Sequence, residues 1–427
     1  FSWTQEYWPQ TSGWGPNTYT VPTELERQGN FSQSIDQSGK AIVVKDPLTG
    51  VAFPGAVIPS SRMDVSGASL FKLLPLPNFT DRNISKGGYN YLVQGSFDKP
   101  QMMNTLKVDY HITQQDIASL TWSRHSDVQT GTNGLATPNA GWDLENRTFA
   151  TRGNIMSGRY QKIFTPTLIN ELVFGYNWRF ENEVIPDSVL KTMTMANIGF
   201  TAPQPYPTSN PGLYLPNVTL GGGPTPSPIA LTYTNVGLQA NIPTYNITDN
   251  ITKIRGNHTF KAGFFFNRGN YINQPTNDRG ALSFAVDVNN PNDTGNTWAN
   301  TYMGAFASYS QRNKILVTDG IYKAYEWFVQ DSWKVNRRLS LEIGVRFAVS
   351  PPGFSAFEEG MFDPRAFDPS KAVKLIRPTM VNGKRVGIDP NTQMIYPAVN
   401  IGAIAPNSGD LANGITLASK TQQGIID

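Results

Sequence analysis

The chain has 427 residues, of which 39% are hydrophobic and 11% aromatic, and its formal net charge is +3. Its mean hydropathy is −0.34, and no apolar run reaches the roughly 20 residues that a transmembrane helix needs. These values exclude a helical membrane protein, while the aromatic content favours a folded β structure over a disordered chain. The sequence contains no cysteine, so disulfides and thiolate chemistry are ruled out. The small net charge, without a Lys/Arg block, argues against a nucleic-acid partner.

The first 100 residues begin with aromatic side chains and continue as a long polar connection. We expect residues 1–100 to hold a first strand remnant and a long extracellular loop. Trp3, Trp8 and Trp14 lie close together in the sequence. They are candidate ligand-binding residues, because aromatic rings give a glycan a flat surface to stack on. The alternative is an aromatic girdle at a membrane interface.

Residues 101–182 are predicted to form two β-hairpins, because hydrophobic and polar side chains alternate there with a period of 2. The return strand of the second hairpin places five large hydrophobic residues on one face: Leu172, Phe174, Tyr176, Trp178 and Phe180. Glu171 and Arg179 point the other way. We expect these two charged residues to face the lumen of a barrel, where they are candidate ligand contacts.

Residues 183–244 are predicted to be a long loop, rich in proline and glycine. Residues 245–350 add two more hairpins with an intervening long loop. After a turn at 336–338, Leu341, Ile343 and Phe347 alternate with Glu342 and Arg346. A slip by one residue would turn both charges toward lipid, at about 2–4 kcal/mol for each charge near the midplane. The register is therefore well specified, and Glu342 and Arg346 become further candidate ligand contacts in the lumen.

Residues 351–427 are predicted to be another long extracellular loop, which leaves the barrel incomplete. Short turns at one end and long loops at the other are typical of outer-membrane barrels, whose long loops face the cell exterior. The predicted strands are close to the roughly 9–11 residues of a membrane crossing, whereas strands of a soluble β-sandwich usually have about 5–6. The expected fold class is therefore all-β: an antiparallel transmembrane β-barrel segment with long extracellular loops, surrounded by outer-membrane lipid.

No motif selects a catalytic group, so we expect no enzyme activity and no cofactor. The sequence contains neither a Gly-x-Ser-x-Gly elbow nor a His-Glu-x-x-His motif. Its three histidines lie far apart and lack the spacing of metal ligands. Asp287, Asn289, Asn292 and Asp293 make an oxygen-rich stretch that is a weak calcium candidate, because it lacks the EF-hand pattern. The alternative is a solvated loop.

Five short sequence motifs, which we call phrases, follow one another in a recognisable order. They are PTELERQGNFS at 22–32, DPLTG at 46–50, FPG at 53–55, LPLPN at 74–78 and FVQDSWK at 328–334. In this order the chain resembles the Oar-like TonB-dependent receptors that carry a carboxypeptidase-regulatory-like domain, of the acidobacterial type. The resemblance implies a longer precursor with a plug and a barrel of roughly 22 strands. It also implies an energy-coupling TonB complex as partner, reached through the plug region, which this internal barrel segment lacks.

Two functions are consistent with these observations. The first is an outer-membrane TonB-dependent receptor or transporter that takes up a bulky nutrient, a glycan or a peptide, held by the loops and by lumen-facing charges. The alternative is a structural or adhesive cell-surface β protein, whose loops form a layer, an appendage or a self-assembled structure. Neither end of the chain resembles a signal peptide or a closing strand. We therefore expect a segment that does not transport on its own.

Overall fold

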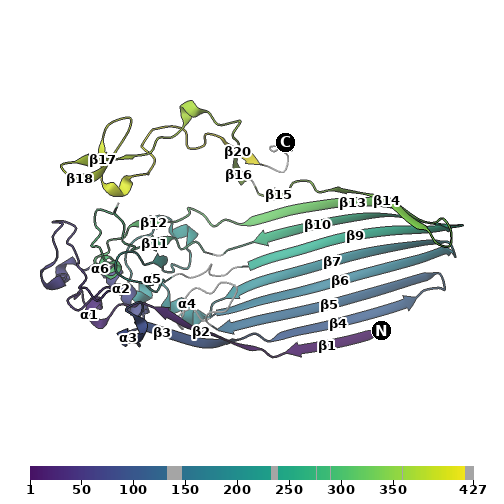
Figure 1. Cartoon of the computed structure of the whole chain (residues 1–427), viewed down its shortest axis with the longest axis horizontal. Coiled ribbons are helices and arrows are strands. Elements are labelled where there is room, and N and C mark those ends of the chain that lie inside the picture. The colour runs from purple at the N-terminus through teal and green to yellow at the C-terminus, as the bar shows by residue number, and fades with distance from the viewer. Residues whose placement is uncertain (132–146, 232–238, 276, 289, 358, 419–427) are drawn as a thin grey trace.

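The computed structural model describes residues 1–131, 147–231 and 239–418, apart from Thr276, Asn289 and Glu358. A twisted antiparallel sheet of long strands makes up one part of the molecule, and the long connections are gathered at one end of it (Figure 1). This confirms the predicted fold class. Among the described residues, no helix combines the length and the apolar character required to cross a membrane.

The large sheet has 12 strands, and its main path runs β1-β4-β5-β6-β7-β9-β10-β13-β14. The bounds along this path are β1 Ser2–Trp8, β4 Gln101–His111, β5 Asp116–Gly131, β6 Arg147–Thr165, β7 Leu168–Val184, β9 Gln239–Arg255, β10 His258–Asn273, β13 Thr318–Lys334 and β14 Ser340–Val349. Three further strands join it: β2 Thr11–Tyr19, β3 Tyr91–Asp98 and β15 Phe354–Ser355. All neighbouring strands pair antiparallel, and each predicted hairpin is present.

Tight turns close the hairpins at the end of the sheet far from the long connections (Figure 1). In the turn between β13 and β14, Asn336 Oδ1 accepts hydrogen bonds from the backbone N–H groups of Arg338 and Leu339, at 2.8 and 3.0 Å. Between β9 and β10, Gly256 has a φ of 58°, in the left-handed region that favours glycine. Both turns were predicted from the sequence.

The strands are longer than predicted. β6 has 19 residues, and β7, β9 and β13 have 17 each. At about 3.3 Å per residue these strands measure roughly 55–65 Å, far more than a bilayer's apolar thickness even when tilted. The excess lies toward the long connections: β9 begins at Gln239, whereas the sequence predicted a start at 245.

The long connections fold together into one domain, which we call the cap (residues 20–90, 185–231 and 277–317). Its helices are α1 Glu24–Arg27, α2 Val65–Leu70, α3 Arg82–Ser85, α4 Asp187–Thr192, α5 Met195–Ile198 and α6 Thr297–Met303, with 3-10 turns at Pro54–Ala56, Ser60–Arg62, Phe71–Leu73 and Pro207–Ser209. A small sheet is made of β8 Asn217–Thr219, β11 Ala281–Ser283 and β12 Ser308–Ser310. One hydrophobic cluster joins all three segments. Within it, the Phe71 and Trp298 ring centroids lie 6.5 Å apart, edge to face.

Four of the five phrases that carry the family resemblance are structural parts of the cap, and the fifth, FVQDSWK, belongs to β13. Thr23 and Glu26 form a capping box at α1, which ties down the backbone of the helix start. The guanidinium of the next residue, Arg27, donates hydrogen bonds to the carbonyls of Phe71, Leu74 and Pro75. These contacts join the first phrase to the LPLPN phrase. The first phrase and the LPLPN phrase therefore help to specify how the cap folds.

Residues 351–418 were predicted to be a loop and contain further strands. These are β16 Glu359–Phe362, β17 Arg377–Val381, β18 Lys384–Ile388, β19 Ile395–Tyr396 and β20 Ile415–Ala418, with 3-10 turns at Pro369–Lys371 and Ala398–Asn400. They make two small sheets, β16-β20 and β17-β18-β19. Asn382 and Gly383, with φ of 50° and 73°, form the turn between β17 and β18.

Candidate functional site

One face of the large sheet is apolar; we call it the apolar face and its opposite the polar face. Residues that pair directly across an antiparallel ladder lie on the same face. Tyr176 pairs with Tyr245 and Trp327 with Phe347, and their ring centroids are 5.1 and 5.8 Å apart. The same pairings place on this face the hydrophobic residues expected to meet lipid, among them Leu106, Val108, Leu120, Trp122, Leu172, Phe174, Leu341, Ile343 and Val345.

The apolar face becomes charged toward the cap. Arg124 on β5, Arg152 on β6, and the paired Arg268 and Lys323 on β10 and β13 all continue the apolar rows. Such side chains are costly at the middle of a bilayer, so they mark where the lipid-facing band ends. The band occupies the half of each strand nearest the short turns. This accounts for strands that are longer than one membrane crossing.

The four charged residues predicted to face the lumen all lie on the polar face. Three of its ion pairs join Arg159 to Glu171, Arg179 to Glu181 and Arg346 to Glu326. Glu342 pairs with Ser332 across the ladder and is exposed. Strands β9, β10 and β13 separate Glu171 and Arg179 from Glu342 and Arg346. The structure thus places these residues on one surface without bringing them into one site.

The three tryptophans near the start of the chain do not form one platform. Trp3 pairs with Leu106 on the apolar face, whereas Trp8 pairs with Gln101 on the polar face. Trp14 lies on β2 with its ring over Gly95 of β3, where an added Cβ would come within 2.8 Å of the ring. Their role in ligand binding remains a prediction, which Trp8 fits best because it lies on the polar face.

In the calcium candidate, both carboxylate oxygens of Asp293 accept hydrogen bonds from the protein. Its Oδ2 accepts the backbone N–H of Asp287 at 3.0 Å, and its Oδ1 accepts the N–H of Gly295 and the amide of Asn300, both at 2.9 Å. Asn289 lies outside the described residues. Over the part of the chain that the structure describes, no cluster of three or more His, Cys, Asp or Glu could hold a metal ion. The geometry thus gives Asp293 a role in shaping the loop.

A polar cleft of about 610 Å³ lies where the cap meets β10 and β13. Asn273 and Thr318, which pair on the polar face, line the cleft from the ends of β10 and β13. From the cap, Gln311 and Arg312 line it together with Asp278. Arg312 is 67% exposed, and its Nη1 lies 3.6 Å from Asp278 Oδ2. The cleft therefore presents charged and amide groups at the cap end of the polar face.

A second opening, of about 280 Å³, lies within the cap and is mostly apolar. Phe200, Phe284, Phe306 and Tyr309 line it together with prolines. Phe306 is 50% exposed, so its ring is available to a ligand. Burial raises the pKa of Tyr309, whose hydroxyl donates to the Gln311 side chain at 3.0 Å. Gln311 thus connects this apolar pocket with the polar cleft.

Sequence reasoning missed both openings. Their residues come from short segments that lie far apart in the chain and have no shared spacing. The one available signal was the proline-rich stretch around 203–207, which we interpreted only as loop composition. Its backbone is held by Gln311, whose amide bonds the carbonyl of Tyr206 at 3.0 Å and whose oxygen accepts the Tyr206 N–H at 3.1 Å.

Comparison with known proteins agrees with this geometry. A family model described as "Outer membrane beta barrel domain" matches residues 1–413. No curated protein matches the chain. Among solved structures, the outer membrane transporter YddB from Escherichia coli is similar at 9% identity with a TM-score of 0.35, over 64% of this chain and 30% of that chain. The chain belongs to the outer membrane β-barrel domain family, which places it in the bacterial outer membrane.

Proposed function

We propose that this chain supplies barrel wall and an external ligand-binding cap to an outer-membrane transporter that takes up a bulky polar nutrient, a glycan or a peptide. The observation that carries the proposal is the polar cleft between the cap and the polar face. Asn273 and Thr318 belong to the wall, and Arg312 and Gln311 belong to the cap. A ligand in this cleft would contact both parts before it entered the lumen.

The chemistry of the two openings suits such ligands. Glycans and peptides carry many hydrogen-bond donors and acceptors, which the amide, carboxylate and guanidinium groups of the cleft can satisfy. The exposed ring of Phe306, beside Tyr309, adds a surface on which a sugar ring or an apolar side chain can stack. We infer that the pocket anchors one end of the ligand while the cleft holds its polar part.

Along the lumen, we propose Glu171, Arg179, Glu342 and Arg346 as weaker contacts for the ligand in passage. Three of them are paired with an opposite charge, so their own charges are largely neutralised. A polar ligand would therefore meet many exchangeable hydrogen bonds and few strong charges. Energy from a TonB complex, coupled through a plug elsewhere in the protein, belongs to this proposal and rests on the family resemblance.

The test uses cells that produce the whole natural protein, with fluorescein-labelled dextran oligosaccharides and fluorescein-labelled casein peptides as probes. One probe class should accumulate, and a protonophore should stop the accumulation. Replacing Arg312 with Ala should lower uptake about fivefold to tenfold, because a charge-assisted contact in the cleft is lost. Arg365→Ala is the matched control, since Arg365 is similarly exposed, pairs with the nearby Asp363 and does not line the cleft.

Two results would contradict the proposal. If neither probe entered faster than in cells without the protein, uptake of a bulky nutrient would be wrong. If uptake continued after the proton gradient was dissipated, energy coupling would be wrong. In the first case the adhesive alternative predicts that cells carrying the protein clump together, which sedimentation would detect.

A further inference from the structure

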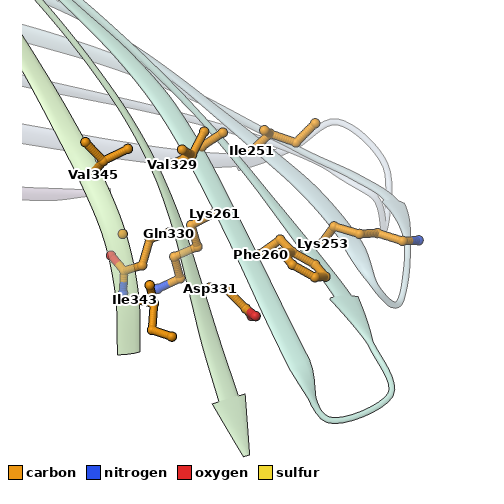
Figure 2. A pocket seen from close by; sticks show the side chains of 11 residues that line it. Ile251, Lys253, Phe260, Lys261, Val329, Gln330, Asp331, Ile343 and Val345 are labelled. Atoms are coloured by element: carbon orange, nitrogen blue, oxygen red, sulfur yellow. The ribbon is translucent and has the colours of Figure 1, made fainter. Parts of the chain in front are cut away.

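A shallow groove crosses the apolar face beside the short turns. It encloses about 550 Å³ and is lined from β9, β10, β13 and β14. Figure 2 shows two rows of side chains across these strands. The row farther from the turns contains Ile251, Val329 and Val345, and the nearer row ends in Lys253. The groove is therefore hydrocarbon-like at one end and is bordered at the other by Lys253, whose ammonium donates to Thr167 Oγ1 at 3.1 Å.

The groove exists because a small residue interrupts a row of large ones. Ala262 pairs with Ile251 on one side and with Val329 on the other. Along its own strand it is flanked on the same face by Phe260 and Phe264, each 44% exposed. A methyl group between four larger side chains leaves a depression, and the lining around it is almost entirely apolar. An alkyl chain fits such a depression better than water does.

The two turns next to the groove are basic. Five exposed cationic residues lie on them or directly beside them: Lys253, Arg255, Lys334, Arg337 and Arg338. The turns adjoin, because the Lys334 N–H donates to the Asn257 carbonyl at 2.9 Å. Asp331 also lines the groove, with His258 Nδ1 2.7 Å from its carboxylate. The five cations outnumber this carboxylate, so the charge at this end is positive.

We propose that this groove is a specific binding site for an anionic phospholipid. One acyl chain lies over Ala262, and the phosphate lies against Lys253 and the adjoining turn residues. The chain's family places it in the outer membrane, so lipid covers this face. The position suits a lipid of the periplasmic leaflet, because the short turns of such barrels face the periplasm. Clustered Lys and Arg beside the bilayer favour anionic headgroups, by about fivefold in affinity for each charge.

The test is native mass spectrometry of the whole protein, stripped of lipid in detergent and titrated with phosphatidylglycerol or with phosphatidylcholine of the same chains. We expect one phosphatidylglycerol to bind and to outcompete phosphatidylcholine. Ala262→Phe fills the depression and should weaken binding about tenfold. Lys253→Gln should weaken phosphatidylglycerol about fivefold and leave phosphatidylcholine unchanged.

Matched controls separate the site from general effects. Ala118→Phe adds the same bulk to the apolar face on β5, away from the groove, and Lys107→Gln removes a cation from the polar face. Neither should change binding, and far-UV circular dichroism should show that every variant keeps its sheet. Equal binding of the two lipids would overturn the proposal. So would equal losses in the groove variants and their controls, or displacement of the bound lipid by inorganic phosphate alone.

Discussion

The guanidinium of Arg27 donates a hydrogen bond to the carbonyl oxygen of Leu74 at 3.1 Å and so joins two phrases of the chain that lie far apart in sequence. Arg27 also bonds the carbonyls of Phe71 and Pro75. One half-buried side chain thus satisfies three backbone acceptors at the end of the helical turn that follows α2. The order of phrases along the sequence therefore reflects the folding of the cap.

Replacing Arg27 with Gln should destabilise the cap. Four carbonyls, those of Pro22, Phe71, Leu74 and Pro75, lose a charged donor, which we expect to cost about 1.5–3 kcal/mol. The measurement is the free energy of local opening, from hydrogen exchange at α1 and α2. Arg82→Gln is the control, because Arg82 is exposed and its Nη2 donates to one carbonyl, that of Asp36. Equal exchange in the two variants would refute the role assigned to Arg27.

Gly67 is required for the contact between α2 and α6. A Cβ added there would lie 1.9 Å from the carbonyl oxygen of Thr301. Gly67→Ala must therefore push the two helices apart, at about 1–3 kcal/mol or more. Gly158→Ala is the control, since an added Cβ meets nothing within 4 Å there. We expect faster hydrogen exchange in α2 and α6 for the first variant only, and unchanged exchange would disprove the close contact.

The pairing of Asp46 with Arg62 predicts a dependence on pH. The hydrogen bond from Arg62, together with the Leu48 N–H, lowers the pKa of Asp46 below its ordinary 3.8. A carboxyl group whose pKa is lower in the folded protein than in the unfolded chain stabilises the fold at pH values above its unfolded-state pKa. This stabilisation is lost as the pH falls through the folded-state pKa. Asp46→Asn should therefore lower the cap's Tm at pH 6, and the difference should narrow as the pH falls below 3.8. A difference that stays constant as the pH falls below 3.8 would contradict this.

The long strands of the large sheet could be predicted well from the sequence and the cap poorly, for a physical reason. In the long strands, hydrophobic and polar neighbours such as Leu341 and Glu342 alternate, because lipid and lumen impose opposite requirements on successive residues. In the cap, the partner of Phe71 is Trp298, on a distant segment, and nothing local reveals the pairing. The ends of the strands nearest the cap were missed, because Arg152 and Arg268 interrupt the alternation there. Lipid no longer faces this part of the sheet.

The charged candidates were placed correctly on the polar face because a period of 2 determines the facing of each residue. Their grouping into a site could not be predicted, since it depends on the sheet order: β9, β10 and β13 lie between Glu171 and Glu342. The polar cleft was missed for the same reason. Arg312 and Asn273 become neighbours only after the cap has folded onto the strand ends.

The orientation of the sheet in the membrane predicts two labelling results in intact cells. Because this sequence contains no cysteine, a single cysteine introduced into it is the one thiol in these residues that a maleimide can label. A cysteine at Leu48, which is 74% exposed in the cap, should react with a membrane-impermeant maleimide. A cysteine at Arg337, in the short turn, should react only after the outer membrane is permeabilised. The reverse pattern would show that the cap faces the periplasm.

The central claim is that the apolar face meets lipid while the polar face meets water. The most direct measurement is the reaction of a water-soluble thiol reagent with single cysteines at Leu341, Ile343 and Ser340 in isolated outer membranes. Leu341 and Ile343 pair with Trp333 and Asp331 on the apolar face, whereas Ser340 pairs with Lys334 on the polar face. We predict rapid labelling at Ser340 and protection at Leu341 and Ile343. Equal labelling at all three positions would contradict the account.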